Sequence, residues 1–353
     1  MTLKKSLMLV ILIFLCGVMA ACGNSSVNEE AADTEKAAEE TIVIGFSQLG
    51  AESDWRSANT ESMKAAFTTE NGYRLIFEDG QQKQANQIMA IRTFIQQEVD
   101  YIVLAPVTET GWDTVLQEAK DAGIPVIIVD RMVDVSDEDL FTCWVGSDFE
   151  LEGKKAAEWL NSYAASKEIA PADIHIVNIQ GTIGASAQIG RTKGIAEAAK
   201  ANGWDLIAEE PGDFTQAKGR EVMESFLKQY DNINVVYCEN DNEAFGAIEA
   251  IEAAGKKVGS DITNGEIMII SFDGVNEEAM KYVAEDKITC IAECNPLHGP
   301  RVQAIIESLE KGEAVDKFSY VDGEVFSSSE TIKSIEVDGS VYEVTIINKE
   351  MLE

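Results

Sequence analysis

The stretch YIVLAPVTETGWDTVLQEAKDAGIPVIIVD, residues 101–130, decides the fold class of this sequence. It contains two β-branched runs, residues 101–106 and 125–130, and Gly123 and Pro125 end a helix-like segment between them. A strand, a helix and a second strand in this order predict parallel strands joined by a right-handed crossover. The stretch therefore predicts an α/β fold.

The same alternation extends through most of the chain. Further predicted strands are residues 41–46, 74–79, 174–181, 204–210, 233–240, 267–274 and 287–294. Helical spacing recurs between them, as in residues 81–97, where Ile88, Ile91, Phe94 and Ile95 share one stripe. A chain of 353 residues, 45% of them apolar, can fill one or two cores. We therefore predict two similar lobes, each with a mostly parallel sheet flanked by helices.

The first 40 residues have the composition of an export signal followed by a tether. Lys4 and Lys5 precede an apolar run, residues 7–19, which is shorter than the roughly 20 residues that span a bilayer. The run closes on Met-Ala-Ala-Cys, which resembles a bacterial lipobox whose Cys22 receives diacylglycerol; the alternative is an ordinary signal peptide with Cys22 incidental. We expect a signal peptide over residues 1–21, a lipid anchor at Cys22 and a flexible tether over residues 22–40.

Charge and motifs exclude several classes of function. A net charge of −34 opposes binding to the phosphate backbone of nucleic acids, which requires a basic surface. The chain has no GxxxxGK[ST] loop, no GxGxxG after its first predicted strand, and no GxSxG or HExxH motif. The acidic run at residues 134–139 lacks the residue order of a calcium loop. We therefore expect no cofactor, no metal and no catalytic centre.

Four cysteines remain outside the leader: Cys143, Cys238, Cys290 and Cys294. An exported protein can form disulfides, but four strand steps separate Cys290 from Cys294 by about 13 Å, which is beyond disulfide reach. No CxxC or HxxxH spacing indicates zinc. Buried free thiols are the favoured interpretation.

Polar and aromatic residues recur where the predicted strands end, which is where open α/β sheets bind ligands. In the first lobe these residues are Gln48, Trp55, Arg56, Asp79, Pro106, Trp112, Asp130 and Arg131. In the second lobe they are Gln180, Asp213, Phe214, Asn240, Asp241, Phe272, Asp273 and Glu293.

This mixture suits a neutral polyol, because guanidinium groups donate, carboxylates accept and a ring covers the apolar face of a sugar. We predict that Trp55 stacks on one face of the sugar and that Phe214 or Phe272 supports the other. The predicted polar contacts come from Arg56, Arg131, Arg191, Asp130, Asn240, Asp273 and Glu293, with Gln48 at the end of the first strand. Each residue alone has a structural alternative: an Asp-Arg pair can be an ion pair, Trp112 and Trp144 can be core residues, and the Gly-rich segment around Arg191 can be a turn that opens a helix.

Several long segments resemble a known family. The segments IGFSQLGAESDWRSA (44–58), FEDGQQKQ (77–84), IQGTIGASAQIGRTKGI (179–195) and ENDNEAFGAIEAI (239–251) are similar to the type I solute-binding proteins of bacterial ABC sugar importers. The resemblance covers about residues 41–325, and within the family it is strongest to the galactofuranose-binding members.

The resemblance implies both a lobe arrangement and a set of ligand contacts. It implies that residues 41–147 plus 294–325 form an N-terminal lobe and residues 148–293 plus 326–353 a C-terminal lobe. The family's binding positions fall on Trp55, Arg56, Asp130, Arg131, Arg191, Phe214, Asn240 and Asp273, with Glu293 where some relatives carry Gln. The segment from residue 327 onward is longer than the family pattern and predicts an added hairpin around Asp338-Gly339. A family cysteine in the fifth-strand region is replaced near His175, which puts a disulfide to Cys238 in doubt.

The sequence thus predicts a monomeric receptor, lipid-anchored to the outer face of the cytoplasmic membrane, that closes over a monosaccharide and presents it to the transmembrane subunits of an ABC permease. One alternative is a sugar-sensing input protein for a chemoreceptor or histidine kinase. Another is a secreted glycoside hydrolase that uses two of the carboxylates. A sugar-responsive repressor would carry an N-terminal helix-turn-helix where this chain has a leader.

Overall fold

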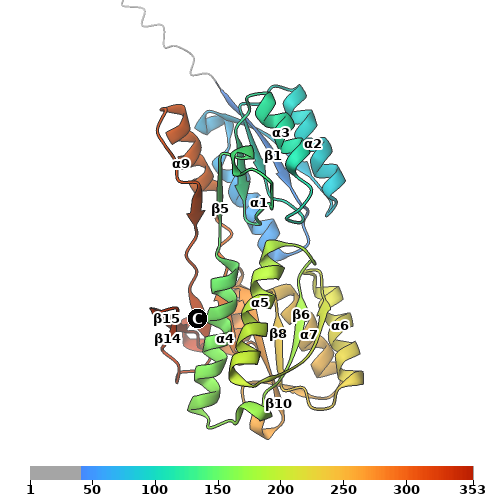
Figure 1. Cartoon of the computed structure of the whole chain (residues 1–353). Coiled ribbons are helices and arrows are strands. Elements are labelled where there is room, and N and C mark those ends of the chain that lie inside the picture. The colour runs from blue at the N-terminus through green and yellow to red at the C-terminus, as the bar shows by residue number, and fades with distance from the viewer. Residues whose placement is uncertain (1–40, 353) are drawn as a thin grey trace, which may run out of the picture. The chain divides into compact units, whose positions relative to one another are not determined.

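The computed structural model describes residues 41–352, which form two α/β lobes (Figure 1). The predicted signal peptide, lipidation site at Cys22 and tether lie outside the described residues. In the described part of the chain, no helix is long and apolar enough to cross a membrane.

The N-terminal lobe has a six-stranded parallel sheet with the order β12-β5-β4-β3-β1-β2. Its strands are β1 (Ile42–Gln48), β2 (Tyr73–Asp79), β3 (Tyr101–Leu104), β4 (Val126–Val129), β5 (Cys143–Gly146) and β12 (Phe318–Tyr320). Its helices are α1 (Asp54–Ala66), α2 (Gln84–Gln96), α3 (Asp113–Asp121) and α9 (Gly299–Glu310). Helices α2 and α3 bury Ile91, Phe94 and Leu116 against one face of the sheet, while α1 and α9 bury Met63 and Val302 against the other.

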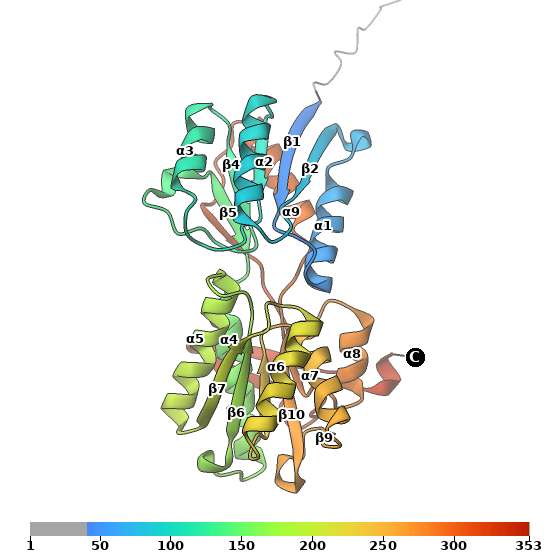
Figure 2. The same cartoon turned by 90° about the vertical axis from the view of Figure 1, so that its right-hand side faces the viewer.

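The C-terminal lobe has a nine-stranded sheet with the order β14-β15-β13-β11-β10-β8-β6-β7, and β9 pairs with β10. Its strands are β6 (His175–Gln180), β7 (Asp205–Pro211), β8 (Val235–Cys238), β9 (Lys257–Val258), β10 (Glu266–Asp273), β11 (Cys290–Glu293), β13 (Val325–Ser327), β14 (Ser334–Val337) and β15 (Ser340–Ile346). Its helices are α4 (Phe149–Ser166), α5 (Ser186–Asn202), α6 (Gln216–Gln229), α7 (Asp241–Ala253) and α8 (Glu277–Ala284). Helices α4 and α5 cover one face, and α6, α7 and α8 cover the other (Figure 2).

The chain passes between the two sheets three times, after β5, after β11 and after β12. Strand β12 pairs with β5 in the first sheet, and β13 then pairs with β11 in the second. The carboxyl ends of the parallel strands in both lobes lead toward these crossings (Figure 1).

The predicted α/β fold class and the C-terminal hairpin are confirmed. Strands β14 and β15 pair antiparallel around Asp338 and Gly339, whose φ angles of 51° and 80° suit a tight hairpin turn. Four strands were not predicted in the segments they occupy: β5, β9, β12 and β13. Each has two to four residues and at most one β-branched residue, so none shows a β-branched run.

Cysteines 143, 238, 290 and 294 are all buried, as predicted. Burial raises the pKa of each thiol, to about 11 for Cys143, so these thiols are un-ionised at neutral pH. Trp112 and Trp144 belong to the core of the N-terminal lobe, which confirms their structural interpretation.

Candidate functional site

A small cavity, with about 20 Å³ of water-accessible volume, lies where loops at the strand ends of the two sheets meet. The N-terminal lobe contributes Glu52, Ser53, Trp55, Arg56, Asp130 and Arg131 to its lining. The C-terminal lobe contributes Phe149, Ala187, Arg191, Phe214, Asn240 and Asp273, and Cys294 comes from the crossing segment after β11.

The start of α1 presents Trp55 and Arg56 to the cavity. Ser53 caps this helix, because its hydroxyl accepts the backbone N–H of Arg56 at 3.1 Å. The first helical turn then places both side chains in the interior, where the Trp55 residue is only 4% exposed and Arg56 only 2%.

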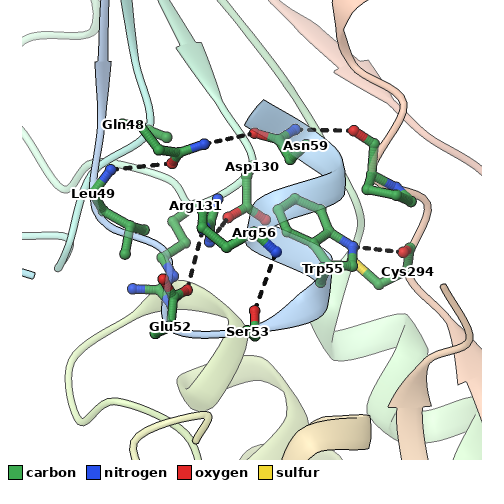
Figure 3. Close-up of polar contacts among 12 residues, drawn as sticks. Gln48, Leu49, Glu52, Ser53, Trp55, Arg56, Asn59, Asp130, Arg131 and Cys294 are labelled. Atoms are coloured by element: carbon green, nitrogen blue, oxygen red, sulfur yellow. Dashed lines mark hydrogen bonds and ion pairs between the residues drawn. The ribbon is translucent and has the colours of Figure 1, made fainter. Parts of the chain in front are cut away.

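The N-terminal half of the cavity is a network of four charged side chains (Figure 3). Arg56 donates to Asp130 at 2.6 Å and to Glu52 at 3.1 Å. Arg131 donates to the carbonyl of Val107 at 2.8 Å and lies 3.4 Å from the same Glu52 oxygen. Two arginines therefore face two carboxylates, and this half carries little net charge.

Neighbouring charges determine the ionisation of Asp130 and Arg131 in the N-terminal half of the cavity. Burial disfavours an ionised Asp130, but the charges of Arg56 and Arg131 outweigh burial and lower its pKa. Burial, together with the neighbouring Arg56 charge, lowers the pKa of Arg131 to about 10. Asp130 and Arg131 are therefore both ionised at neutral pH.

Arg191 is the centre of the C-terminal half. Helix α5 carries it into the interior, where it pairs with Glu152 of α4 at 2.9 Å and with Asp273 at the end of β10 at 3.3 Å. It also donates to the backbone carbonyl of Glu239, and its guanidinium stacks 4.6 Å from the centre of the Phe272 ring. One guanidinium thus holds the ends of two strands and two helices together.

Two aromatic rings flank the charged groups. The indole N–H of Trp55 donates to the carbonyl of Cys294 at 2.6 Å, and the Arg56 guanidinium lies 4.7 Å from the Trp55 ring centre. Across the cavity, the Phe214 ring lies 5.0 Å from the guanidinium of Arg131. The rings are thus held by contacts that cross between chain segments.

Three lining residues adopt left-handed backbone conformations: Asp130 (φ 62°), Phe214 (φ 61°) and Asp273 (φ 96°). Such conformations are costly for residues other than glycine and cluster at functional sites. Two lining side chains also hold buried polar atoms with no hydrogen-bond partner among residues 41–352: Nη1 of Arg56 and Oε2 of Glu52. A donor and an acceptor thus remain free in one half of the cavity.

Hydrogen bonds also join the two lobes directly. The backbone N–H of Asp54 donates to Asn242 at 2.9 Å, and Asn276 donates to the Asp54 carboxylate at 2.7 Å. On another side, the N–H of Glu109 donates to the Gly184 carbonyl at 3.0 Å.

Eight of the predicted site residues line the cavity together: Trp55, Arg56, Asp130, Arg131, Arg191, Phe214, Asn240 and Asp273. Gln48, Phe272 and Glu293 do not line it. Gln48 is buried and donates to Asn59 and Thr60 of α1, while Phe272 packs in the core behind Arg191. Glu293 instead accepts the backbone N–H of Glu324 at 2.8 Å, between two crossing segments.

Glu52, Ser53, Phe149, Ala187 and Cys294 line the cavity without having been predicted. All five lie in loops or at helix starts, whose side-chain directions no strand pattern fixes. Glu52 had one usable signal, since it lies four residues before Arg56 and forms an ion pair with it. In residues 41–352, no cluster of three or more His, Cys, Asp or Glu side chains could hold a metal ion.

Two α/β lobes, three crossings and a cavity at the strand ends define a periplasmic binding protein of type I. The chain belongs to this family: the family model described as periplasmic binding protein domain matches residues 44–298. It is 43% identical over 283 residues to the galactofuranose-binding protein YtfQ of Escherichia coli (strain K12), an alignment that covers 79% of this chain and 85% of that protein.

Solved structures agree with this assignment. A protein from Mycobacterium smegmatis in complex with β-D-fucofuranose has a TM-score of 0.76 and 44% identity, covering 81% of this chain and 91% of that one. The binding component of the arabinose ABC transporter from Shewanella sp. ANA-3, bound to α- and β-L-arabinofuranose, has a TM-score of 0.74 and 40% identity, with coverage of 81% and 92%. Both solved structures hold furanose sugars, one of them is named as an ABC transporter component, and the family model that this chain matches describes a binding protein.

Proposed function

We propose that this protein captures a furanose monosaccharide of the galactofuranose type in the cavity between its lobes and delivers it to the permease of an ABC importer. The observation that carries the proposal is the state of the three arginines that line the cavity. Each is already paired with a carboxylate: Arg56 with Asp130, Arg131 with Glu52, and Arg191 with Glu152 and Asp273.

Paired arginines favour a neutral ligand over an anionic one. An anion would have to compete with buried carboxylates for the same guanidinium groups, whereas a hydroxyl can accept from a guanidinium and donate to its carboxylate. Nη1 of Arg56 and Oε2 of Glu52 supply such a donor and acceptor on neighbouring side chains. Trp55 and Phe214 supply apolar surfaces for the C–H faces of a sugar ring.

The furanose assignment draws on the relatives, because the relative from Escherichia coli is named for galactofuranose and the two solved structures hold furanose sugars. A sugar that touches both lobes stabilises the closed arrangement by its differential contacts, and the permease would recognise that arrangement.

Calorimetric titration of residues 41–353 tests the proposal, after unfolding and refolding to remove carried-over ligand. The panel contains galactofuranose, galactopyranose, arabinose and ribose, with galacturonate as a charged control. We expect micromolar affinity, about −8 kcal/mol, for a furanose and no heat with galacturonate. Tight binding of galacturonate would contradict the proposal that the ligand is neutral. If no sugar in the panel gave a heat of binding, the proposal that the ligand is a furanose sugar would be contradicted.

We also propose that Cys22 carries a diacyl anchor, since two acyl chains are enough for stable membrane residence. The lipobox-like sequence before Cys22 supports this proposal. The Cys22→Ala variant should move from the membrane fraction to the medium or periplasm, while Cys238→Ala, a buried cysteine in the folded lobe, should stay membrane-bound. Retention of the Cys22→Ala variant in the membrane would contradict the proposed lipid anchor at Cys22.

A further inference from the structure

Glu243 lies against the backbone of Phe214, although it does not line the cavity. It occupies the first turn of α7, whose N-cap Asn240 accepts the backbone N–H of Glu243 at 2.8 Å. The Glu243 residue is 0% exposed. Its Oε1 atom accepts the backbone N–H of Phe214 at 2.8 Å.

The segment that Glu243 supports is held in an unfavourable conformation. Asp213 and Phe214 both have left-handed φ angles, 55° and 61°, which cost free energy for residues with a side chain. The Phe214 ring lies so close to Gly181 that a Cβ atom there would come within 1.9 Å of it. Asn240 donates to the Phe214 carbonyl at 3.1 Å, so Glu243 and Asn240 fix the N–H and the carbonyl of the same residue.

No cation pairs with Glu243 in the described residues, and its Oε2 atom has no hydrogen-bond partner there. The charged groups that face it are the acids Glu239 and Asp273 and the cation Arg191, which is already engaged by Glu152 and Asp273. From α6, the backbone of Gly219 approaches Glu243, while Arg220 pairs with Glu224 and Glu249 at the surface.

This environment disfavours a charge. A buried carboxylate without a cation costs far more free energy than the neutral acid, and such groups take up a proton instead. Glu239 offers a contrast within the same lobe, because its oxygens accept from Asn178, Thr192 and the backbone N–H of Gly181.

We propose that Glu243 is a neutral carboxylic acid at neutral pH and that it positions the Phe214 ring against the sugar, an inference that rests on the sugar site proposed above. Burial and the nearby Glu239 charge raise the pKa of Glu243 well above its ordinary value, in agreement with the geometry. Glu243 is a positioning residue, since it acts on the ligand through the backbone of Phe214.

The first test needs no ligand and measures the proton. A glutamate that stays neutral in the folded state and ionises on unfolding destabilises the fold as pH rises between its two pKa values, by up to tenfold per pH unit in the unfolding constant. We expect the unfolding constant of the wild type, divided by that of E243Q, to increase between pH 5.5 and 7.5. The increase should approach tenfold per pH unit. The control E249Q removes an exposed glutamate of the same helix and should leave the ratio flat. A flat ratio for E243Q as well would overturn the neutral state.

The second test measures positioning. E243Q keeps the neutral shape and the acceptor, so its sugar affinity at pH 7 should stay within about threefold of wild type. E243L keeps the bulk but leaves the Phe214 N–H unpaired, and should lose about tenfold or more. In an F214A background the E243L change should add less than about twofold, because the ring that Glu243 positions is gone while the backbone N–H remains. An equal loss in both backgrounds would overturn the positioning role.

A third measurement separates this inference from the sugar function. If the wild type binds no sugar, the proposed function fails, but a crystal structure of ligand-free E243L still tests the positioning. We expect φ of Phe214 to leave the left-handed region in that variant. An unchanged Phe214 would overturn the inference even where sugar binding is intact.

Discussion

Asp130 and Asp273 occupy matching places in the two lobes, yet their surroundings give them opposite acidities. Asp130 follows β4, Asp273 ends β10, and both have left-handed backbones. Arg56 and Arg131 outweigh burial and lower the pKa of Asp130, whereas burial, with only the shared Arg191 opposing it, raises the pKa of Asp273 well above its ordinary value. The number of guanidinium groups per carboxylate accounts for the difference.

The excess of buried carboxyl groups over guanidinium groups extends behind the cavity in the C-terminal lobe. Burial raises the pKa of Glu152, and it raises those of Glu239 and Asp241 to about 7 each. One half of the site is therefore a set of permanent ion pairs, and the other is a group of acids that can hold protons near neutral pH. Substitutions in the two halves should consequently differ in size and in pH dependence.

The largest effect is expected for Arg191→Ala. It removes the guanidinium that Glu152 and Asp273 share, so both acids lose their compensating charge. We expect a loss of about 3–5 kcal/mol in stability. The loss should grow as pH rises, because both acids would stay protonated in the folded variant but ionise on unfolding. Sugar binding should become undetectable by calorimetry. Urea unfolding at pH 5.5 and 8 measures the first effect, and Arg220→Ala on the surface of the same lobe is the control.

A smaller loss is expected for Arg131→Ala, because Arg56 still pairs with both Glu52 and Asp130. The variant loses one guanidinium of the proposed sugar site and its contact with the Phe214 ring. We expect binding to weaken by about 2–4 kcal/mol with little change in pH dependence. Calorimetry measures this, with Arg92→Ala, an exposed arginine of the N-terminal lobe, as control. A loss in Arg131→Ala as large as that in Arg191→Ala would contradict the proposed difference between the halves.

Glu239→Gln tests the proton-holding half directly. The folded pKa of Glu239 is about 7, above that of an unfolded glutamate, so the wild-type group favours folding at low pH and loses this contribution as pH rises toward 7. The variant should lack this slope, which amounts to about 1 kcal/mol per pH unit between roughly pH 4.5 and 7. Urea midpoints across this range give the comparison. Parallel curves for the variant and the wild type would mean that Glu239 does not titrate in the folded protein over this range.

The sequence predicted the fold class and most of the cavity, because β-branched runs locate the strands and the residues at their ends converge. It did not predict which way each end residue points. Successive residues of a strand point to opposite faces, so Asp273 enters the cavity while Phe272 enters the core. Glu52 and Phe149 lie in a loop and at the start of a helix, where only the tertiary fold sets the direction of the side chain.

The smallest effect is expected for Glu293→Gln, which tests the direction of a side chain at a strand end. Glu293 ends β11 beside Asp273, with which it pairs in register, yet its carboxylate accepts the backbone N–H of Glu324 instead of facing the cavity. We expect sugar affinity to change by less than about twofold and stability to fall by about 1 kcal/mol, since a charge-assisted hydrogen bond becomes a neutral one. Asp273→Asn, one strand away, replaces the carboxyl group that pairs with Arg191 in the cavity and should weaken binding much more. If the two variants lost affinity equally, the crossing segment after β11 would have to turn Glu293 into the cavity when sugar binds. The prediction that Glu293 contacts the sugar would then hold for the bound state.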